Sequence, residues 1–325
     1  MQAVLVGHGS VGIKHLKNLK AISNKINIID PISNSATFRS LDNFAKEFSK
    51  IKNVPDMQRI AVIANWGPDH LTATSKLFSL GFNRILIEKP MATNLAQIDE
   101  YESMIAQGLN AWCNYHLRFS LIMNTLHSFQ NNNSLGSPKS ISVVGGAKCL
   151  STTGIHWIDL AVKLFNEIPL KIYGNVMNAK INPRNNQLSF LDGINFFRFS
   201  DNRTLTLNFN NYSQADATIT ILWEHFLAKI HSGKIQIFGA NLENHNLLPI
   251  TRTVNFDKLL IDEKFFDEGF DILFKEFLIS NSSLDQLFVA NRALLLSLCS
   301  SHLERTIDWN ESLSEDLIHH DWGIS

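Results

Sequence analysis

The sequence predicts two domains of different architecture. Residues 1–118 are expected to form an α/β domain built on a doubly wound parallel sheet, and residues 119–325 an α+β domain with a large, open, mainly antiparallel sheet. A chain of 325 residues exceeds what one hydrophobic core usually holds. Short apolar runs alternate with helical stretches in the first third, which is typical of parallel strands joined by helices. Beyond that point, strand-like segments follow one another directly.

In the first domain the apolar runs predict five strands, and the amphipathic stretches between them predict four helices. The expected strands are 3–6, 26–29, 60–64, 84–87 and 110–114. The expected helices are 11–22, 41–48, 70–80 and 95–106. Because strands and helices alternate, the strands should pair in parallel through right-handed crossovers.

In the second domain, segments such as 204–209 alternate apolar and polar residues, as half-buried strands do. The expected strands are 140–144, 171–177, 193–199, 204–209, 217–222 and 234–238. The expected helices are 120–129, 263–278 and 284–305. Residues 319–322, which include two histidines and a tryptophan, are expected to lie in a surface tail.

Composition narrows the class of protein. A net charge of -1 leaves no overall basic field for nucleic acid or an anionic membrane. No stretch approaches the roughly 20 apolar residues of a membrane span, and the first residues carry no secretory signal pattern. The three cysteines lie far apart, so no disulfide framework and no metal site is expected. A cytoplasmic protein with reduced thiols fits best.

A glycine-rich turn follows the first expected strand and opens the first helix. Residues 7–12 read Gly7-His8-Gly9-Ser10-Val11-Gly12, a G-x-G-x-x-G pattern. The first glycine permits the tight turn, the second lets the backbone approach a pyrophosphate, and the third allows helix and strand to pack closely. The helix N-terminus then offers unpaired N–H groups to phosphate oxygens. The turn therefore predicts a dinucleotide-binding Rossmann domain. The competing interpretation is a glycine-rich turn without a ligand.

Asp30 indicates which dinucleotide is bound. It ends the second expected strand, 18 residues after Gly12, close to the usual spacing for the acid that holds the adenosine ribose. A carboxylate there repels a 2′-phosphate, so NAD is favoured over NADP. Arg39 lies nearby in the sequence and could bind a 2′-phosphate, so NADP stays possible as the cofactor.

A charged tripeptide, Glu88-Lys89-Pro90, ends the fourth expected strand. Ligands of open parallel sheets bind beyond the carboxyl ends of the strands, so these residues should face the cofactor. Pro90 ends strand pairing and fixes the turn. A partly buried lysine can serve as an acid, a base or a hydrogen-bond donor to a substrate hydroxyl. On its own, the tripeptide equally suits an exposed ion pair in a loop.

Together with three other segments, these residues resemble the glucose–fructose oxidoreductase / inositol dehydrogenase / rhizopine catabolism (Gfo/Idh/MocA) oxidoreductase family. The four matching features are the glycine turn with His15 three residues after it, the segment 64–70, the Glu-Lys-Pro tripeptide, and the segment 114–119. The segment 64–70 has Asn65-Trp66-Gly67 where the family commonly has Thr-Pro-Asn.

In the second domain the resemblance narrows to Gly154-Ile155-His156-Trp157-Ile158-Asp159, at the start of an expected helix. His156 and Asp159 share one face of that helix, and an imidazole titrates near neutrality. Without the resemblance, the preferred interpretation of His156 would be a structural histidine at the start of a helix, hydrogen-bonded to the backbone. Family members typically have an aspartate four residues before this histidine, where this chain has Thr152. A hydroxyl can orient a substrate but cannot carry a negative charge at neutral pH.

The resemblance implies hydride transfer between a nicotinamide and a hydroxyl or keto carbon of a sugar, cyclitol or nucleotide-sugar. Lys89 and His156 would be catalytic, and Thr152, Asp159 and Arg118 would bind the substrate. The cofactor would be held by the remaining predicted site residues, together with Lys89: Gly7, His8, Gly9, Ser10, Val11, Gly12, Asp30, Asn65, Trp66, His70 and Glu88. The resemblance also implies a homodimer or homotetramer. Two alternatives stay open: an NAD-binding sensor or partner subunit without turnover, and an enzyme that uses bound NAD transiently for elimination or epimerisation.

Overall fold

The structure is a computed structural model that forms two compact units. It describes residues 1–50, 58–120, 123–124, 126, 136–146, 149–181, 187–224, 226–231, 234–239, 254–255, 264–282 and 285–324. Unit 1 combines Met1–Asn114, Leu273–Asn291 and Ser314–Ser325. Unit 2 combines Tyr115–Ile272 and Arg292–Leu313. A single boundary after residue 118 was expected, but the chain returns to unit 1 twice.

Unit 1 contains the expected parallel sheet. Its strands are β1 (Gln2–Val6), β2 (Ile26–Ile29), β3 (Arg59–Ile63), β4 (Arg84–Ile87) and β5 (Asn110–Cys113). They lie in the order β2-β1-β3-β4-β5, and every pair is parallel. A single parallel bridge from Ile29 to Phe38 adds a further position outside β2. With that bridge, the order matches that of dinucleotide-binding folds, which confirms the predicted fold class.

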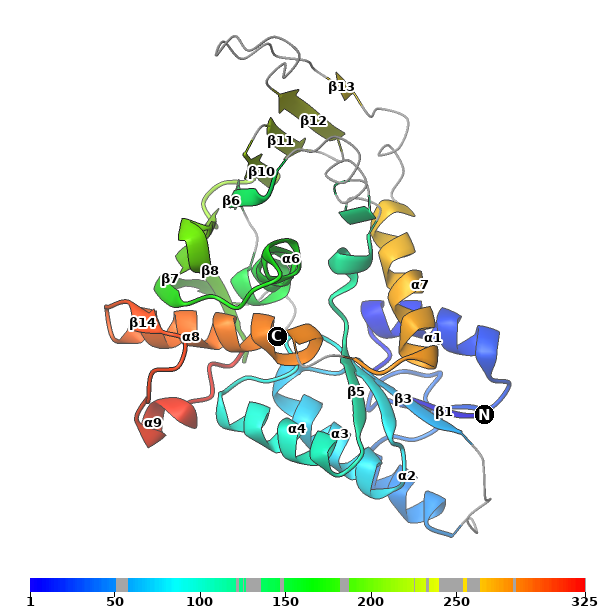
Figure 1. Ribbon diagram of the computed structural model, residues 1–325. Helices are drawn as coiled ribbons and strands as arrows, with labels where there is room; N and C mark the ends of the chain where they lie inside the picture. Colours follow the sequence, from blue (N-terminus) through cyan, green and yellow to red (C-terminus); the bar gives the residue numbers. More distant parts are fainter. Residues whose placement is uncertain are drawn as a thin grey trace. The chain divides into compact units, whose positions relative to one another are not determined.

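Helices cover both faces of this sheet, as a doubly wound fold requires. They are α1 (Ser10–Ile22), α2 (Leu41–Phe48), α3 (His70–Ser79) and α4 (Ala96–Ala106). In Figure 1, α3 and α4 lie side by side on one face and α1 lies on the other. Ser40 caps α2 by accepting the backbone N–H of Asn43. The central strands are buried apolar runs, as parallel strands between two helix layers should be.

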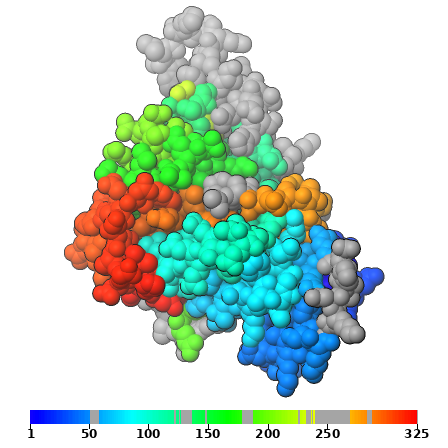
Figure 2. Space-filling view, turned by 60° about the horizontal axis from the view of Figure 1, so that its bottom comes forward, coloured from blue at the N-terminus to red at the C-terminus, as the bar shows by residue number. Residues whose placement is uncertain are grey.

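Two later segments complete unit 1. The end of α7 (Lys264–Ile279) lies beside the sheet, and Arg84 of β4 donates to the carbonyl oxygens of Phe277 and Ser280. The 314–324 segment, with α9 (Glu315–Ile318), packs by α4, where Leu95 N–H donates to Ile318 O at 3.1 Å. Figure 2 shows this C-terminal segment in red against the cyan region around α4. Residues 319–321 are exposed, as expected of a surface segment, whereas Ile324 beyond them is fully buried.

Unit 2 contains a large mixed sheet. Its described strands are β6 (Pro138–Gly146), β7 (Lys171–Ile181), β8 (Ser189–Arg198), β9 (Thr204–Asn210), β10 (Thr218–Trp223), β11 (Phe226–His231), β12 (Lys234–Gly239), β13 (Val254–Asn255) and β14 (Ile307–Asp308). The order is β13-β12-β11-β10-β6-β9-β8-β7-β14. The pair β6–β9 is parallel and the other described pairs are antiparallel. The six predicted strands are all present, whereas β11, β13 and β14 were not predicted.

Helix α6 (Ile155–Phe165) and most of helix α8 (Ala290–His302) belong to unit 2. A π-helical turn (η3, Leu150–Gly154) leads into α6, and α8 packs on β7. A Cβ on Gly174 of β7 would lie 2.0 Å from the carbonyl oxygen of Ser297 on α8, so this close packing requires glycine. Ser300 and Ser301 of α8 accept the N–H groups of Gly174 and Val176. The helix thus covers backbone donors at the edge of the sheet. The helix expected over 120–129 falls largely outside the described residues.

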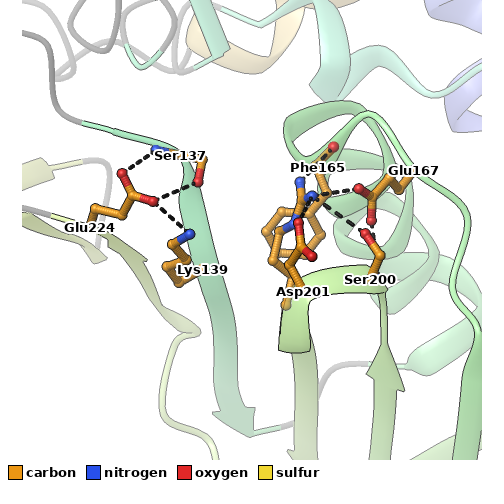
Figure 3. A network of polar contacts seen from close by, with 8 residues as sticks. Ser137, Lys139, Phe165, Glu167, Ser200, Asp201 and Glu224 are labelled. Carbon is orange, nitrogen blue, oxygen red and sulfur yellow. Dashed lines mark hydrogen bonds and ion pairs between the residues drawn. The ribbon is translucent and has the colours of Figure 1, made fainter.

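Arg203 fixes the end of α6 to the turn that joins β8 and β9. Its guanidinium donates to the carbonyl oxygen of Phe165 at 3.0 Å and to the carboxylate of Glu167 (Figure 3). The same group contacts Ser200 and Asp201 in that turn.

In the part of the chain that is described, no helix has the length and apolarity needed to cross a membrane.

Candidate functional site

The glycine turn has the shape that a bound diphosphate requires. Gly7 has φ +88, and a Cβ on it would lie 2.4 Å from Ala64 O; a Cβ on Gly12 would lie 2.2 Å from Gly7 O. Only glycine fits at either position. At Gly9, in contrast, the Cβ position is open, with nothing within 4 Å. Helix α1 begins here with no side-chain cap and no acidic residue in its first turn. Its first N–H groups are therefore available to an anion.

Asp30 is tied directly to this turn. Its carboxylate accepts the backbone N–H groups of His8 at 2.8 Å, Ile32 at 2.9 Å and Ser33 at 2.7 Å. Burial raises the pKa of Asp30, but these hydrogen bonds outweigh it and lower the pKa below its usual value. The carboxylate therefore stays ionised beside the phosphate turn, where it retains acceptor capacity for ribose hydroxyls. Arg39 is exposed and donates to Ser33 O at 2.8 Å.

Glu88 lies at the centre of a buried polar cluster just beyond β4. Its Oε1 atom accepts from Asn114 Nδ2 at 2.6 Å and lies 2.7 Å from His15 Nε2. Burial raises the pKa of Glu88, but the hydrogen bond and charge of His15, the charge of Lys89 and the Asn114 hydrogen bond outweigh it and bring the pKa to about 2. This carboxylate links the phosphate-binding helix α1 to the strand end that carries Lys89.

The segment that follows Lys89 is fixed residue by residue. The Lys89-Pro90 peptide bond is cis. Pro90 O lies 2.9 Å from His70 Nδ1, and His70 Nε2 lies 3.1 Å from Asn65 O. Asn291, from the start of α8, accepts Ala92 N–H at 3.2 Å and donates to Ala92 O at 2.9 Å. The backbone on the C-terminal side of the lysine is therefore held by side chains from two separate elements, α3 and α8.

His70 and Trp66 occupy different environments at the same strand end. His70 is almost completely buried, and burial lowers its pKa despite the two backbone contacts, which favour the charged form. The neutral ring donates only one N–H, so it ties Asn65 or Pro90 more strongly than the other. Trp66 is 40% exposed, which leaves the indole accessible to a ligand.

His156 lies in the first turn of α6, in unit 2, and is 7% exposed. Its ring packs edge-to-face against His116, with centroids 4.5 Å apart, and against Tyr115 at 6.5 Å. Thr152 lies in the preceding π-helical turn, a conformation that often occurs at functional sites, and is half-buried. The sequence between Cys149 and Ile155 contains no carboxylate.

Arg118 and Asp159, both predicted to bind substrate, bind each other. Arg118 Nε lies 2.9 and 3.1 Å from the two oxygens of Asp159, and Nη2 makes a further contact. The side chains are 3% and 0% exposed. A buried pair of this kind fixes η2 (His116–Phe119), which carries Arg118, against α6. In this conformation neither side chain reaches solvent, so contact with a substrate would require the pair to move.

The predicted residues thus fall into two groups. Unit 1 contains the predicted cofactor-binding residues and Lys89: the glycine turn, Asp30, Asn65, Trp66, His70, Glu88 and Lys89. Unit 2 contains the other four: Arg118, Thr152, His156 and Asp159. Three further residues were not predicted as site residues: Asn114, His116 and Asn291. Asn114 and His116 lie in a segment that the sequence had already marked as similar to the family. Nothing in the local sequence around Asn291 marks it. Among the described residues, no group of His, Cys, Asp and Glu could hold a metal ion.

Comparisons with known proteins identify similar folds. Residues 1–111 match the model of an oxidoreductase family with an NAD-binding Rossmann fold, GFO_IDH_MocA. An oxidoreductase from Agrobacterium radiobacter, solved with NAD+, L-tartaric acid and magnesium, is similar with a TM-score of 0.72 and 11% identity, over 95% of this chain and 98% of that one. No curated protein matches the sequence.

Two other solved structures are similar over nearly their whole length. Myo-inositol 2-dehydrogenase from Lactobacillus plantarum has a TM-score of 0.68 and 15% identity, over 95% of this chain and 99% of that one. UDP-N-acetylglucosamine 3-dehydrogenase from Acidithiobacillus ferrooxidans has a TM-score of 0.68 and 15% identity, over 93% and 97%. At these identities the likeness concerns the fold. In its glycine turn, parallel sheet and Glu-Lys-Pro strand end, the part of the chain up to residue 111 matches the NAD-binding Rossmann domain of the Gfo/Idh/MocA oxidoreductase family.

Proposed function

We propose that this protein transfers a hydride between NAD(H) and a hydroxyl or keto carbon of a sugar, cyclitol or nucleotide-sugar. The observation that carries the proposal is that hydrogen bonds join Asp30 to the glycine turn, and join Glu88, the neighbour of Lys89, to the helix that follows this turn. A framework of this kind is what a dehydrogenase needs to hold a dinucleotide and a proton-transfer group in register. The family model for residues 1–111 and the dehydrogenases among the similar structures support it.

The unit 1 residues fit the cofactor in three respects. The open Cβ position of Gly9 leaves room for a diphosphate, the first N–H groups of α1 have no side-chain cap, and Asp30 stays ionised. Bound there, the nicotinamide supplies the acceptor or donor of the hydride. Asp30 would accept hydrogen bonds from the adenosine ribose hydroxyls, and its negative charge would repel a 2′-phosphate, which makes NAD the preferred cofactor.

Two side chains would handle the proton of the substrate hydroxyl. Lys89 would donate a hydrogen bond to the reacting oxygen and stabilise the negative charge that develops on it. His156 would accept the proton during oxidation and return it during reduction. Thr152 would orient the substrate through its hydroxyl, since it cannot provide charge.

The test is a comparison of Lys89→Ala with the wild type. We expect the variant to bind NADH within about threefold of the wild type, measured by calorimetry, while kcat falls roughly 10²–10⁴-fold, the usual contribution of an acid–base group. Lys50→Ala is the matched control, because Lys50 forms an exposed ion pair with Glu47 in the same unit. Turnover of Lys89→Ala at the wild-type rate would remove the assigned role.

The substrate search uses a panel of cyclitols, sugars and nucleotide-sugars with NAD+ and NADP+, followed by absorbance of the reduced nicotinamide. One alternative is favoured by Thr152, which stands where a carboxylate would otherwise assist His156. If NADH binds tightly but no member of the panel changes the absorbance, a cofactor-binding sensor replaces the dehydrogenase as the proposed function. Cofactor that copurifies, together with product formed without net reduction, would indicate elimination or epimerisation.

A further inference from the structure

A second imidazole packs against His156 within unit 2. His116 and His156 meet edge-to-face, with ring centroids 4.5 Å apart and an angle of 65° between the rings. Phe270 of α7 contacts the His116 ring at 6.2 Å. His156 is 7% exposed, whereas His116 is half-buried. Of the two rings, His116 therefore has the better access to solvent.

The turn that leads into the helix of His156 contains no carboxylate. Residues 149–155 contain neither Asp nor Glu, and Asp159 is occupied by Arg118 on both of its oxygens. A nearly buried imidazole that exchanges a proton with a substrate must still pass that proton on, because it cannot act again until its protonation state is restored. His116 is in closer ring contact with it than Tyr115 is, and an imidazole can accept and release a proton near neutral pH.

We propose that His116 is the proton partner of His156 and relays protons between it and solvent. In the oxidation direction, the O–H bond of the substrate breaks, its proton forms a bond with one ring nitrogen of His156, and the proton on the other ring nitrogen passes to His116 and then to water. Reduction runs the same transfers in reverse. Two cationic rings this close repel each other, so at most one ring of the pair holds an extra proton, and is cationic, while the pair works. The proposal rests on the dehydrogenase function proposed above.

Several other titratable groups stand on the elements that pack against the pair. Arg118 of η2 and Asp159 of α6 neutralise each other in their buried ion pair. Tyr115 precedes His116 and contacts the His156 ring edge-to-face. Beyond Phe270, helix α7 carries Asp271, Lys275 and Glu276. Coupling between the two imidazoles, which are in direct ring contact, should add to the effect of these charges on their titration.

The first test needs no substrate. Ring resonances of the histidines are followed by NMR as a function of pH in the wild type, in His116→Phe and in His231→Phe. In the wild type, we expect the His116 and His156 signals to respond to the same two steps, separated by at least about one pH unit. His116→Phe keeps an aromatic ring in place and should leave His156 with a single step. The control removes an exposed histidine that contacts Thr218 and should change neither signal. Identical titration of His156 in the wild type and His116→Phe would overturn the proposal.

The second test separates proton transfer from packing. We expect His116→Phe to lower kcat about 10–100-fold, less than loss of the acid–base group itself, with little change in KM. In His116→Ala, added imidazole should restore turnover, whereas pyrazole, which has the same size but is far less basic, should not. Equal rescue by both compounds would show that His116 acts only by filling space. If the rings titrate as a coupled pair but the wild type turns over no substrate, the proposed function fails and the pair stands.

Discussion

Asn291 is expected to be a sensitive uncharged residue of unit 1. Asn291 and Ala92 are both fully buried, and the Asn291 amide makes both of its hydrogen bonds to the Ala92 backbone. Asn291→Leu keeps the volume of the side chain but leaves the Ala92 N–H and C=O groups without partners. Each buried group left in this way costs about 1–3 kcal/mol. Since the two groups share one side chain, we expect a total loss of about 3 kcal/mol.

The assay is thermal unfolding followed by tryptophan fluorescence, together with NADH binding and turnover. A loss of this size corresponds to a fall in melting temperature of roughly 6–12 °C for a unit of this size. Asn110→Leu is the matched control, because Asn110 also bridges to a late segment, through Asn281, but at the surface. The control should lose less than about 1 kcal/mol.

The same variant tests how the backbone after Lys89 is held. Below the melting transition, Asn291→Leu should lower kcat more than it weakens NADH binding, since Ala92 lies three residues beyond Lys89 and Asp30 is untouched. Equal destabilisation by Asn291→Leu and Asn110→Leu would refute the reasoning from buried backbone partners. An unchanged kcat in a folded Asn291→Leu protein would show that this clamp does not position Lys89.

Three further predictions concern charge. Arg203→Ala should lower the free energy of unfolding by about 1–3 kcal/mol in denaturant titrations, because the variant loses the hydrogen bond to the end of α6 and the ion pair with the partly buried Glu167. Lys139→Ala is the control and should lower it little, because Lys139 belongs to an exposed ion pair. The pKa of Glu88 is lowered to about 2, so the stability that its ionised carboxylate contributes is fully present above the ordinary pKa of 4.5 and is lost as the pH falls toward 2. Glu88→Gln should therefore flatten the dependence of the unfolding free energy on pH in this range, and an unchanged slope would contradict the lowered pKa. Asp30→Ser should weaken NADH binding and raise the ratio of NADPH to NADH affinity at least about tenfold by calorimetry, and a constant ratio would exclude Asp30 as the specificity residue.

The sequence was most informative where structure depends on local pattern. The strands of unit 1 could be predicted because each is a short, continuous apolar run, and the phosphate turn because three glycines stand at fixed spacing. The predicted helix 41–48 coincides with α2, whose Ser40 cap and apolar stripe are both readable from sequence. These features involve residues within one or two turns of each other.

Prediction failed where a residue's role is set by a distant segment. Asn291 lies 199 residues from Ala92 in sequence, and the partners Arg118 and Asp159 are 41 residues apart. Single-sequence patterns contain no record of such contacts. The turn 150–154 is π-helical, although Ser, Thr and Gly are equally typical of ordinary turns. β14 spans only two residues, too few to show any alternation.

The clamp on Ala92 has a consequence for synthesis of the chain on the ribosome. The amide that satisfies Ala92 emerges 199 residues after it, which at 5–20 residues per second is a delay of about 10–40 seconds. The docking partner of Leu95, Ile318, follows later still. The strand end around Lys89 therefore lacks these hydrogen bonds while residues 115–272 of the other unit are translated. Assembly of the cofactor site is thereby postponed until the chain is nearly finished.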